Sequence, residues 1–167
     1  AIPAGSFVDA HAQVCFGRDG LPTRLTGRLL TLDFPAWRQV LPQVYTWHRD
    51  LDRTALRSVA ALCANVQRGQ HQPMFRLSDN GSTRLQIAIQ GPIDGGLQIQ
   101  TEIDVQAADE DMPSFGFNPH FVMDALAGLD STVRWSGSAG KLSPTELRSK
   151  ERGQLDRFAI VMPMRLD

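Results

Sequence analysis

The sequence is poor in lysine, carries almost no net charge and has no long apolar run. Lysine occurs only at Lys141 and Lys150, and 17 basic residues against 18 acidic ones leave a formal net charge of −1. This balance does not predict a strongly cationic nucleic-acid-binding domain, although a local basic stripe would be hidden in such a sum. No apolar run approaches the ~20 residues of a membrane span, and the N-terminus shows no signal peptide. We therefore expect a cytoplasmic protein without membrane contact.

Groupings typical of metal sites are also missing. The two cysteines, Cys15 and Cys63, do not show the spacing of metal ligands. Cys63 falls on the apolar face of an expected helix, as a buried thiol does. The acidic run 109–111 could hold a hard cation, but a solvated loop before Pro113 is the better interpretation. The histidines are scattered, at His11, His48, His71 and His120. We expect no metal and no cofactor.

The sequence contains no motif typical of an enzyme. It has no glycine-rich phosphate loop, no HExxH and no GxSxG. Asp50 and Asp52 flank an expected helix start, where carboxylates are favoured for capping alone. No acid–base partner accompanies these carboxylates, so we expect no catalytic residue and no enzyme.

Two helices and many short strands are predicted by the hydrophobic pattern. A helix over 53–65 follows Asp52 as N-cap, and a second over 119–128 begins at Pro119 after Asn118. Apolar residues alternate along strands at 84–89 and 97–105, as in half-buried antiparallel sheets. Further strands are expected at 12–16 and 23–30 (a hairpin), 44–48, 132–136, 145–148 and 158–162. The sum is an α+β domain after a leader at 1–10.

Four segments resemble the bacterial DNA polymerase sliding clamp (beta subunit). The C-terminal stretch Phe-Ala-Ile-Val-Met-Pro-Met-Arg-Leu, residues 158–166, is similar to the closing strand and tail of that family, and its ending is uncommon elsewhere. Segment 27–42, Gly-Phe-Asn at 116–118 with the helix after it, and Leu-Ser-Pro at 142–144 agree in order and spacing. The resemblance covers about 11–166. It implies a DNA-clamp fold with two helices packed on antiparallel sheets, in which 11–33 ends a preceding domain and 34–167 is the C-terminal domain.

The resemblance also implies a shallow apolar pocket that receives short linear motifs of polymerase and clamp-loader subunits. Methionine suits such a surface because its flexible side chain can repack around varied ligands. Asn118 and Arg165 could supply the polar contacts that orient a peptide. Carried over residue by residue, the pocket is lined by Pro35, Val40, Asn118, Phe121, Leu142, Ile160, Met162, Pro163, Met164 and Arg165.

In the family, the helices line a hole filled by double-stranded DNA. Arg53 and Arg57 lie away from the apolar face of the first helix, as non-specific phosphate contacts would require, although ordinary solvated arginines explain them equally well. Two residues depart from the family pattern. Gln39 stands where a basic residue is common beside the pocket, and Asp167 adds a negative charge close to Arg165.

The length accommodates one clamp domain and the last hairpin of another, whereas a family ring has two chains of three domains. The chain is therefore either a piece of a longer clamp, which would be a homodimer in its complete form, or the tail of another architecture. The alternative function is a clamp-like peptide- or ligand-sensing domain of a transcription regulator. A ring assembled from single-domain units is the least favoured alternative.

Overall fold

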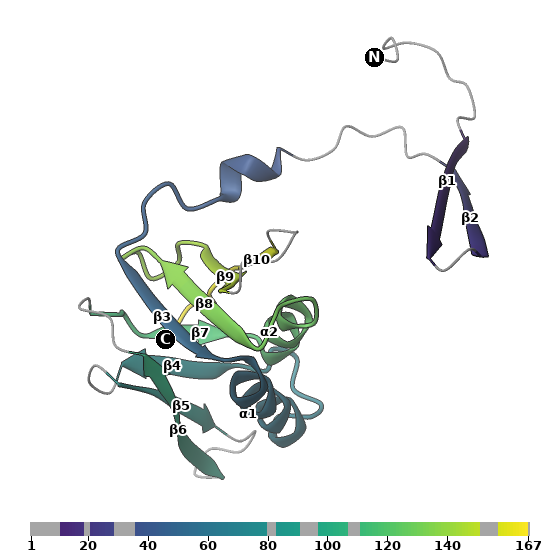
Figure 1. Ribbon diagram of the computed structural model, residues 1–167. Helices are drawn as coiled ribbons and strands as arrows, with labels where there is room; N and C mark the ends of the chain where they lie inside the picture. The colour runs from purple at the N-terminus through teal and green to yellow at the C-terminus, as the bar shows by residue number, and fades with distance from the viewer. Residues whose placement is uncertain are drawn as a thin grey trace. The chain divides into compact units, whose positions relative to one another are not determined.

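The computed structural model describes residues 11–18, 21–28, 36–79, 83–90, 97–106, 111–150 and 157–166. The predicted leader 1–10, Pro35, Asp167 and most of the acidic run 109–111 lie outside these ranges. The chain divides into two compact units, Ala1–Ala36 and Trp37–Asp167. In the first unit, β1 (His11–Arg18) and β2 (Leu21–Arg28) form the expected antiparallel hairpin, with His11 opposite Arg28 (Figure 1). That this hairpin ends a preceding clamp domain stays a prediction.

The second unit contains an eight-stranded antiparallel sheet in the order β10-β9-β8-β3-β6-β5-β4-β7. Its central pairing is short, because β3 and β6 pair through two residue positions, Asp50 with Gln106 and Leu51 with Val105. The strands are β3 (Trp47–Asp52), β4 (Phe75–Asp79), β5 (Arg84–Gln90), β6 (Gln98–Gln106), β7 (Phe115–Phe117), β8 (Thr132–Gly137), β9 (Thr145–Ser149) and β10 (Phe158–Val161). The sheet is thus two four-stranded halves with a narrow junction.

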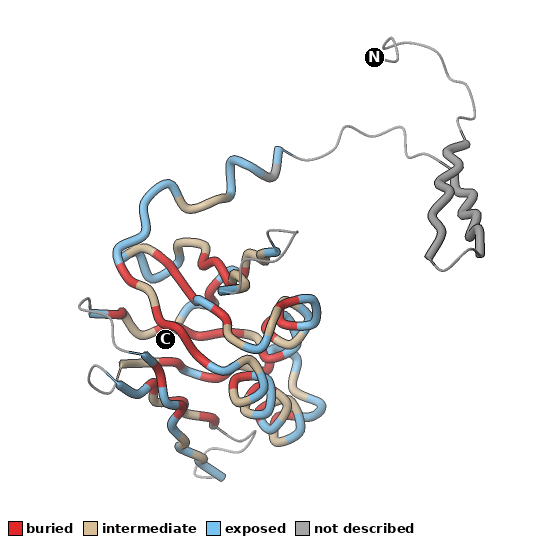
Figure 2. Tube along the Cα trace, viewed as in Figure 1, coloured by how far each residue is buried: buried red, intermediate tan, exposed pale blue. Residues whose placement is uncertain are grey.

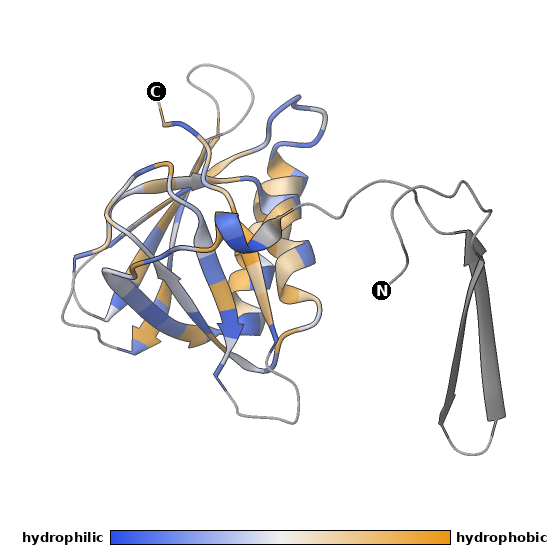
Figure 3. Ribbon diagram, turned by 90° about the horizontal axis from the view of Figure 1, so that it is seen from above, coloured by the Kyte–Doolittle hydropathy of each residue, from blue (hydrophilic) through white to orange (hydrophobic). Residues whose placement is uncertain are grey.

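Local capping defines where the two helices begin. Helix α1 (Arg53–Val66) starts after Asp52, whose side chain accepts a hydrogen bond from the Ala55 amide at 2.7 Å. Helix α2 (Pro119–Leu126) starts after Asn118, whose side-chain oxygen accepts from the His120 amide at 2.9 Å. Both starts are where the sequence predicts them. The helices pack against each other on one side of the sheet (Figures 1 and 3). Their buried residues include Leu56, Ala60 and Cys63 on α1 and Val122 and Leu126 on α2.

An aromatic cluster joins the two halves of the sheet. The ring of Phe115 on β7 lies 5.3 Å from that of Trp47 on β3, and the ring of Phe117 lies 4.7 Å from that of Trp135 on β8. Strand β7 is at one end of the sheet, whereas β3 and β8 belong to the other half. These contacts require the sheet to curl, so that the buried side chains of both halves form one core (Figure 2).

The strand predicted at 44–48 is wrong in its bounds. β3 runs from Trp47 to Asp52 and leads directly into α1. The polar residues of this segment did not predict a buried strand. In the structure, however, Arg49 is almost fully buried and pairs with Asp79, on the neighbouring half of the sheet. Asp50 was expected to support the helix start, but it lies within β3 and pairs with Arg134. A buried charge is tolerated where a partner neutralises it.

Candidate functional site

A groove of about 520 Å³ opens between the segment before β3 and the end of the chain. Short helix η1 (Trp37–Val40) and the residues after it form one wall, the β8–β9 loop forms the second, and Met162 closes it after β10. The lining residues are Gln39, Val40, Leu41, Pro42, Gln43, Val44, Ser138, Ser143, Pro144 and Met162. Of these described lining residues none is charged, so contacts in the groove are apolar or made through amides and hydroxyls.

Apolar side chains on the rim of the groove face solvent. Val40 exposes 51%, Leu142 53% and Met162 53% of the residue surface. Leu142 is not itself a lining residue, but it directly precedes Ser143, which is one. Apolar groups gathered on a surface in this way favour contact with a partner. The structure thus brings together Val40 and Met162 from the predicted pocket, with Leu142 beside them.

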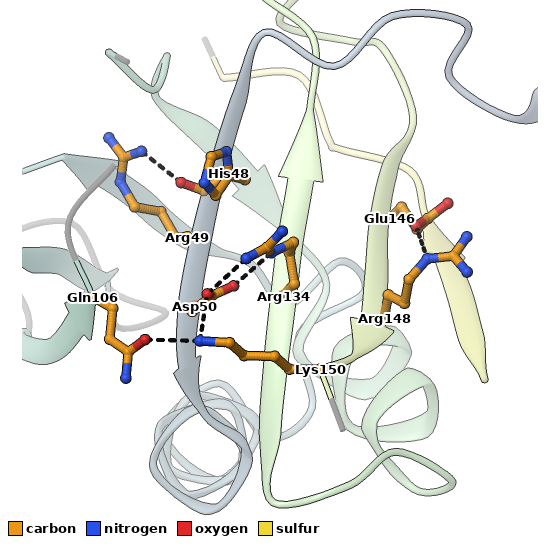
Figure 4. Close-up of polar contacts among 8 residues, drawn as sticks. All are labelled: His48, Arg49, Asp50, Gln106, Arg134, Glu146, Arg148 and Lys150. Atoms are coloured by element: carbon orange, nitrogen blue, oxygen red, sulfur yellow. Dashed lines mark hydrogen bonds and ion pairs between the residues drawn. The ribbon is translucent and has the colours of Figure 1, made fainter. Parts of the chain in front are cut away.

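The wall before β3 is held by contacts to the β8–β9 region. The Thr46 amide donates to the Gly137 carbonyl at 2.8 Å, and the Tyr45 hydroxyl donates to Glu146 at 2.7 Å. Burial, the hydrogen bond to Glu146 and its negative charge raise the pKa of Tyr45 to about 12. Arg148 donates in turn to the other oxygen of Glu146 at 2.6 Å (Figure 4). Because Val44 and Tyr45 are adjacent, these contacts position the groove wall.

A second group of predicted residues lies on or beside α2 and β10. Asn118 caps α2 through its side chain, and Phe121, one turn into that helix, exposes 63% of its surface. Ile160, on β10, pairs in register with Glu146 on β9, and α2 packs beside β10. These three residues do not line the groove of Val40 and Met162. That they complete one pocket with Val40 and Met162 stays a prediction.

The chain end carries the remaining predicted residues. Pro163 is buried, Arg165 is exposed, and the Met164 amide donates to the Gly116 carbonyl on β7 at 2.7 Å. The tail thus runs from the groove to the far edge of the sheet. Pro35, predicted for the pocket, lies outside the described residues.

The two arginines predicted to face DNA have different surroundings. Arg53 is half-buried, and its guanidinium donates to the Leu129 carbonyl at 2.9 Å, just after α2. A cation there stabilises the C-terminal end of that helix. Arg57 is exposed, as is His120 on α2, which faces solvent together with the acidic Asp124. A phosphate contact by either arginine stays a prediction.

A polar cluster that the sequence did not predict surrounds Asp50 on β3. Asp50 accepts two hydrogen bonds from Arg134, at 2.7 and 2.9 Å, and lies 2.9 Å from the Lys150 ammonium (Figure 4). Lys150 also donates to Gln106 at 2.8 Å. The hydrogen bonds and positive charges of Arg134 and Lys150 lower the pKa of Asp50 to about 2 against the opposing effect of burial. These residues are far apart in sequence, so no local spacing could have indicated the cluster.

Within the described ranges, no three His, Cys, Asp or Glu side chains gather closely enough to hold a metal ion. No helix in this part of the chain is long and apolar enough to cross a membrane.

Comparisons with known proteins bear on the fold. No protein-family model matches the chain. The sliding clamp (DNA polymerase III subunit beta) from Pseudomonas aeruginosa bound to griselimycin is similar, at 25% identity and a TM-score of 0.72 over 86% of this chain and 37% of that one. The sliding clamp of Bacillus subtilis matches at 18% identity and a TM-score of 0.76, over 93% of this chain and 39% of that one. The DNA polymerase III beta subunit of Thermotoga maritima matches at 20% identity and 0.74, over 93% and 40%.

These likenesses confirm the resemblance to sliding clamps and the expected α+β clamp-domain fold. The chain spans about two fifths of the length of the clamps it matches.

Proposed function

We propose that this chain is a non-catalytic clamp domain whose groove binds short linear segments of polymerase and clamp-loader subunits. The observation that carries the proposal is the groove between Val40 and Met162, with exposed apolar side chains on its rim. Both residues are among those that the resemblance to sliding clamps implies for a peptide pocket. An extended peptide with apolar side chains would fill such a groove and leave its backbone in water.

In this proposal the complete protein is a cytoplasmic ring that holds polymerase on DNA. The ring encloses double-stranded DNA without reading base edges, so a topological link replaces strong charge attraction. A formal net charge of −1 is compatible with such a link. Of the two predicted arginines, Arg57 is the better candidate for a phosphate contact. It is exposed on α1, whereas Arg53 donates a hydrogen bond to the Leu129 carbonyl.

The test is a titration of this chain with a labelled Gln-Leu-x-Leu-Phe-type peptide. Saturable binding is expected, with an affinity that Met162→Ala lowers by roughly 5- to 50-fold, the range expected for truncating a side chain central to an interface. Because the described groove lining is uncharged, the affinity should change little with salt. Leu62→Ala is the matched control, since Leu62 is also partly exposed but lies on α1, away from the groove.

Two outcomes would count against peptide binding. If Met162→Ala and Leu62→Ala bind equally well, the peptide does not use the groove. If the folded chain shows no binding up to millimolar peptide, the alternative gains support: a clamp-like ligand-sensing domain of a regulator. A small apolar molecule that protects the Met162 methyl group would then be the ligand to seek.

A further inference from the structure

The tail after β10 reaches two separate grooves. Met162 lines the groove described above, and Leu166 lines a second one of about 360 Å³ on the other half of the sheet. Between them the tail crosses the edge strand β7. The other residues of the second groove are Met74, Arg76, Ala88, Ile89, Gln98, Ile99 and Gln100. Three residues lie between Met162, which lines one groove, and Leu166, which lines the other.

The second groove has a floor that suits a single apolar side chain. Ala88 on β5 pairs with Arg76 on one side and with Gln100 on the other. Side chains in register across neighbouring strands stand side by side on the same face. A methyl group between two long side chains leaves a depression, and Leu166 lines it.

Gly116 is the point at which the tail is joined to the sheet. It forms an isolated antiparallel bridge with Met164, whose amide donates to its carbonyl at 2.7 Å. A Cβ atom at Gly116 would lie 2.5 Å from the Met74 sulfur, 3.0 Å from Cδ2 of Leu166 and 3.3 Å from the Met164 carbonyl oxygen. Gly116 has no positive φ, so a side chain added here would meet crowding, by Met74, Leu166 and the Met164 carbonyl, rather than backbone strain. The tail therefore lies directly against the β7 backbone.

We infer that the tail is a docked strap, in which Leu166 and Gly116 are positioning residues that hold Met162 in the peptide groove. The inference rests on the proposed function for its effect on affinity, but the docking is a property of the chain itself. Met162 is half exposed, and it follows the last β10 residue, Val161. Downstream it is held by buried Pro163, the Met164 bridge and Leu166. Removing the Leu166 anchor leaves the buried Pro163 and the Met164 hydrogen bond to hold the strap.

The experiment compares Leu166→Ala with wild type by amide hydrogen exchange and by the methyl resonances of the methionines. We expect exchange at the Met164 amide to accelerate at least tenfold. Local opening of the strap would then break the same hydrogen bond but fewer apolar contacts. The Met162 methyl resonance should shift, and the peptide dissociation constant should rise roughly threefold to tenfold. The Ile87 amide, in the interior strand β5, should keep its protection. Leu62→Ala should leave every one of these readouts unchanged.

Gly116→Ala is the second variant, because its added methyl group would crowd the Leu166 side chain and the Met164 carbonyl oxygen of the strap, together with Met74. It should produce the same Met162 and Met164 changes, and the Ile87 amide reports whether the sheet remains folded. An unchanged Met164 exchange rate in Leu166→Ala would overturn the docked strap. Faster exchange with an unmoved Met162 resonance would overturn the positioning role. If wild type binds no peptide, the proposed function fails. The Met164 exchange rate and the Met162 methyl resonance still decide whether the tail is a docked strap.

Discussion

The phenol oxygen of Tyr45 lies 2.7 Å from Oε2 of Glu146, across 101 positions of the chain. Tyr45 belongs to the segment that forms one wall of the groove between Val40 and Met162, and Glu146 belongs to β9. The bond therefore joins the wall to the sheet. Its geometry is also accessible to measurement, because Tyr45 is the single tyrosine of the chain.

We expect Tyr45 to titrate near pH 12, above the usual value of about 10. Burial is the largest cause, followed by the hydrogen bond to Glu146, which is lost when the phenol ionises. Glu146→Gln should lower the pKa but leave it above 10, because burial remains. The ultraviolet absorbance of tyrosinate measures both titrations, with circular dichroism as a check on folding. A midpoint near 10 in the folded wild-type chain would contradict the bond.

Asp50 should make the domain less stable in acid. Its pKa is lowered from 3.8 to about 2, so the folded state binds fewer protons than the unfolded state between these values. The contribution is therefore complete above pH 4 and is lost as the pH falls through about 2. After allowance for partly exposed Arg134 and Lys150, its size is roughly 1–2 kcal/mol.

Urea unfolding of Asp50→Asn at neutral pH measures that contribution directly, and we expect a loss of roughly 1–2 kcal/mol in the free energy of unfolding. The control is Glu102→Gln. Glu102 pairs at 2.9 Å with Arg84, whose side chain is 56% exposed, and such surface pairs contribute at most about 1 kcal/mol. Equal losses in the two variants would show that the Asp50 cluster is no stronger than a surface pair.

The buried hydroxyl of Thr145 connects two parts of the core. It accepts from the Trp135 indole at 3.0 Å and donates to the Val161 carbonyl at 3.0 Å. Thr145→Val keeps the volume but leaves both groups without this partner, at a cost of about 2 kcal/mol. Urea unfolding measures the loss, and Thr54→Val, at an exposed position of α1, should change stability by less than about 0.5 kcal/mol. An unchanged free energy of unfolding in Thr145→Val would mean that other groups replace the hydroxyl as hydrogen-bond partner.

Cys63 should be unreactive in the folded domain. It is fully buried, and burial raises the pKa of its thiol to about 12, so almost no thiolate forms at neutral pH. In a Cys15→Ser variant, a thiol reagent should modify the chain only when denaturant unfolds it. The modification rate against denaturant concentration is the measurement. Rapid labelling without denaturant would contradict the packing of α1.

Much of the secondary structure could be predicted because its signals are local. Asp52 and Asn118 cap helices within three residues of themselves, and the strands predicted by apolar alternation at 84–89 and 97–105 match β5 and β6 to within a residue at each end. β3 could not be predicted correctly, since Arg49 and Asp50 are stable in a buried strand only with partners far along the chain. Those partners are 30 positions away for Arg49 and 84 for Asp50.

The sequence by itself determined the helix starts, the α+β class and the resemblance of the C-terminal tail to sliding clamps. The tertiary structure alone decided that Val40 and Met162, far apart along the chain, line one groove. It also decided that the tail docks at Gly116, where a missing side chain leaves room for another backbone. A cap depends on neighbours along the chain, whereas a groove and a docked tail depend on the curl of the sheet that brings distant segments together.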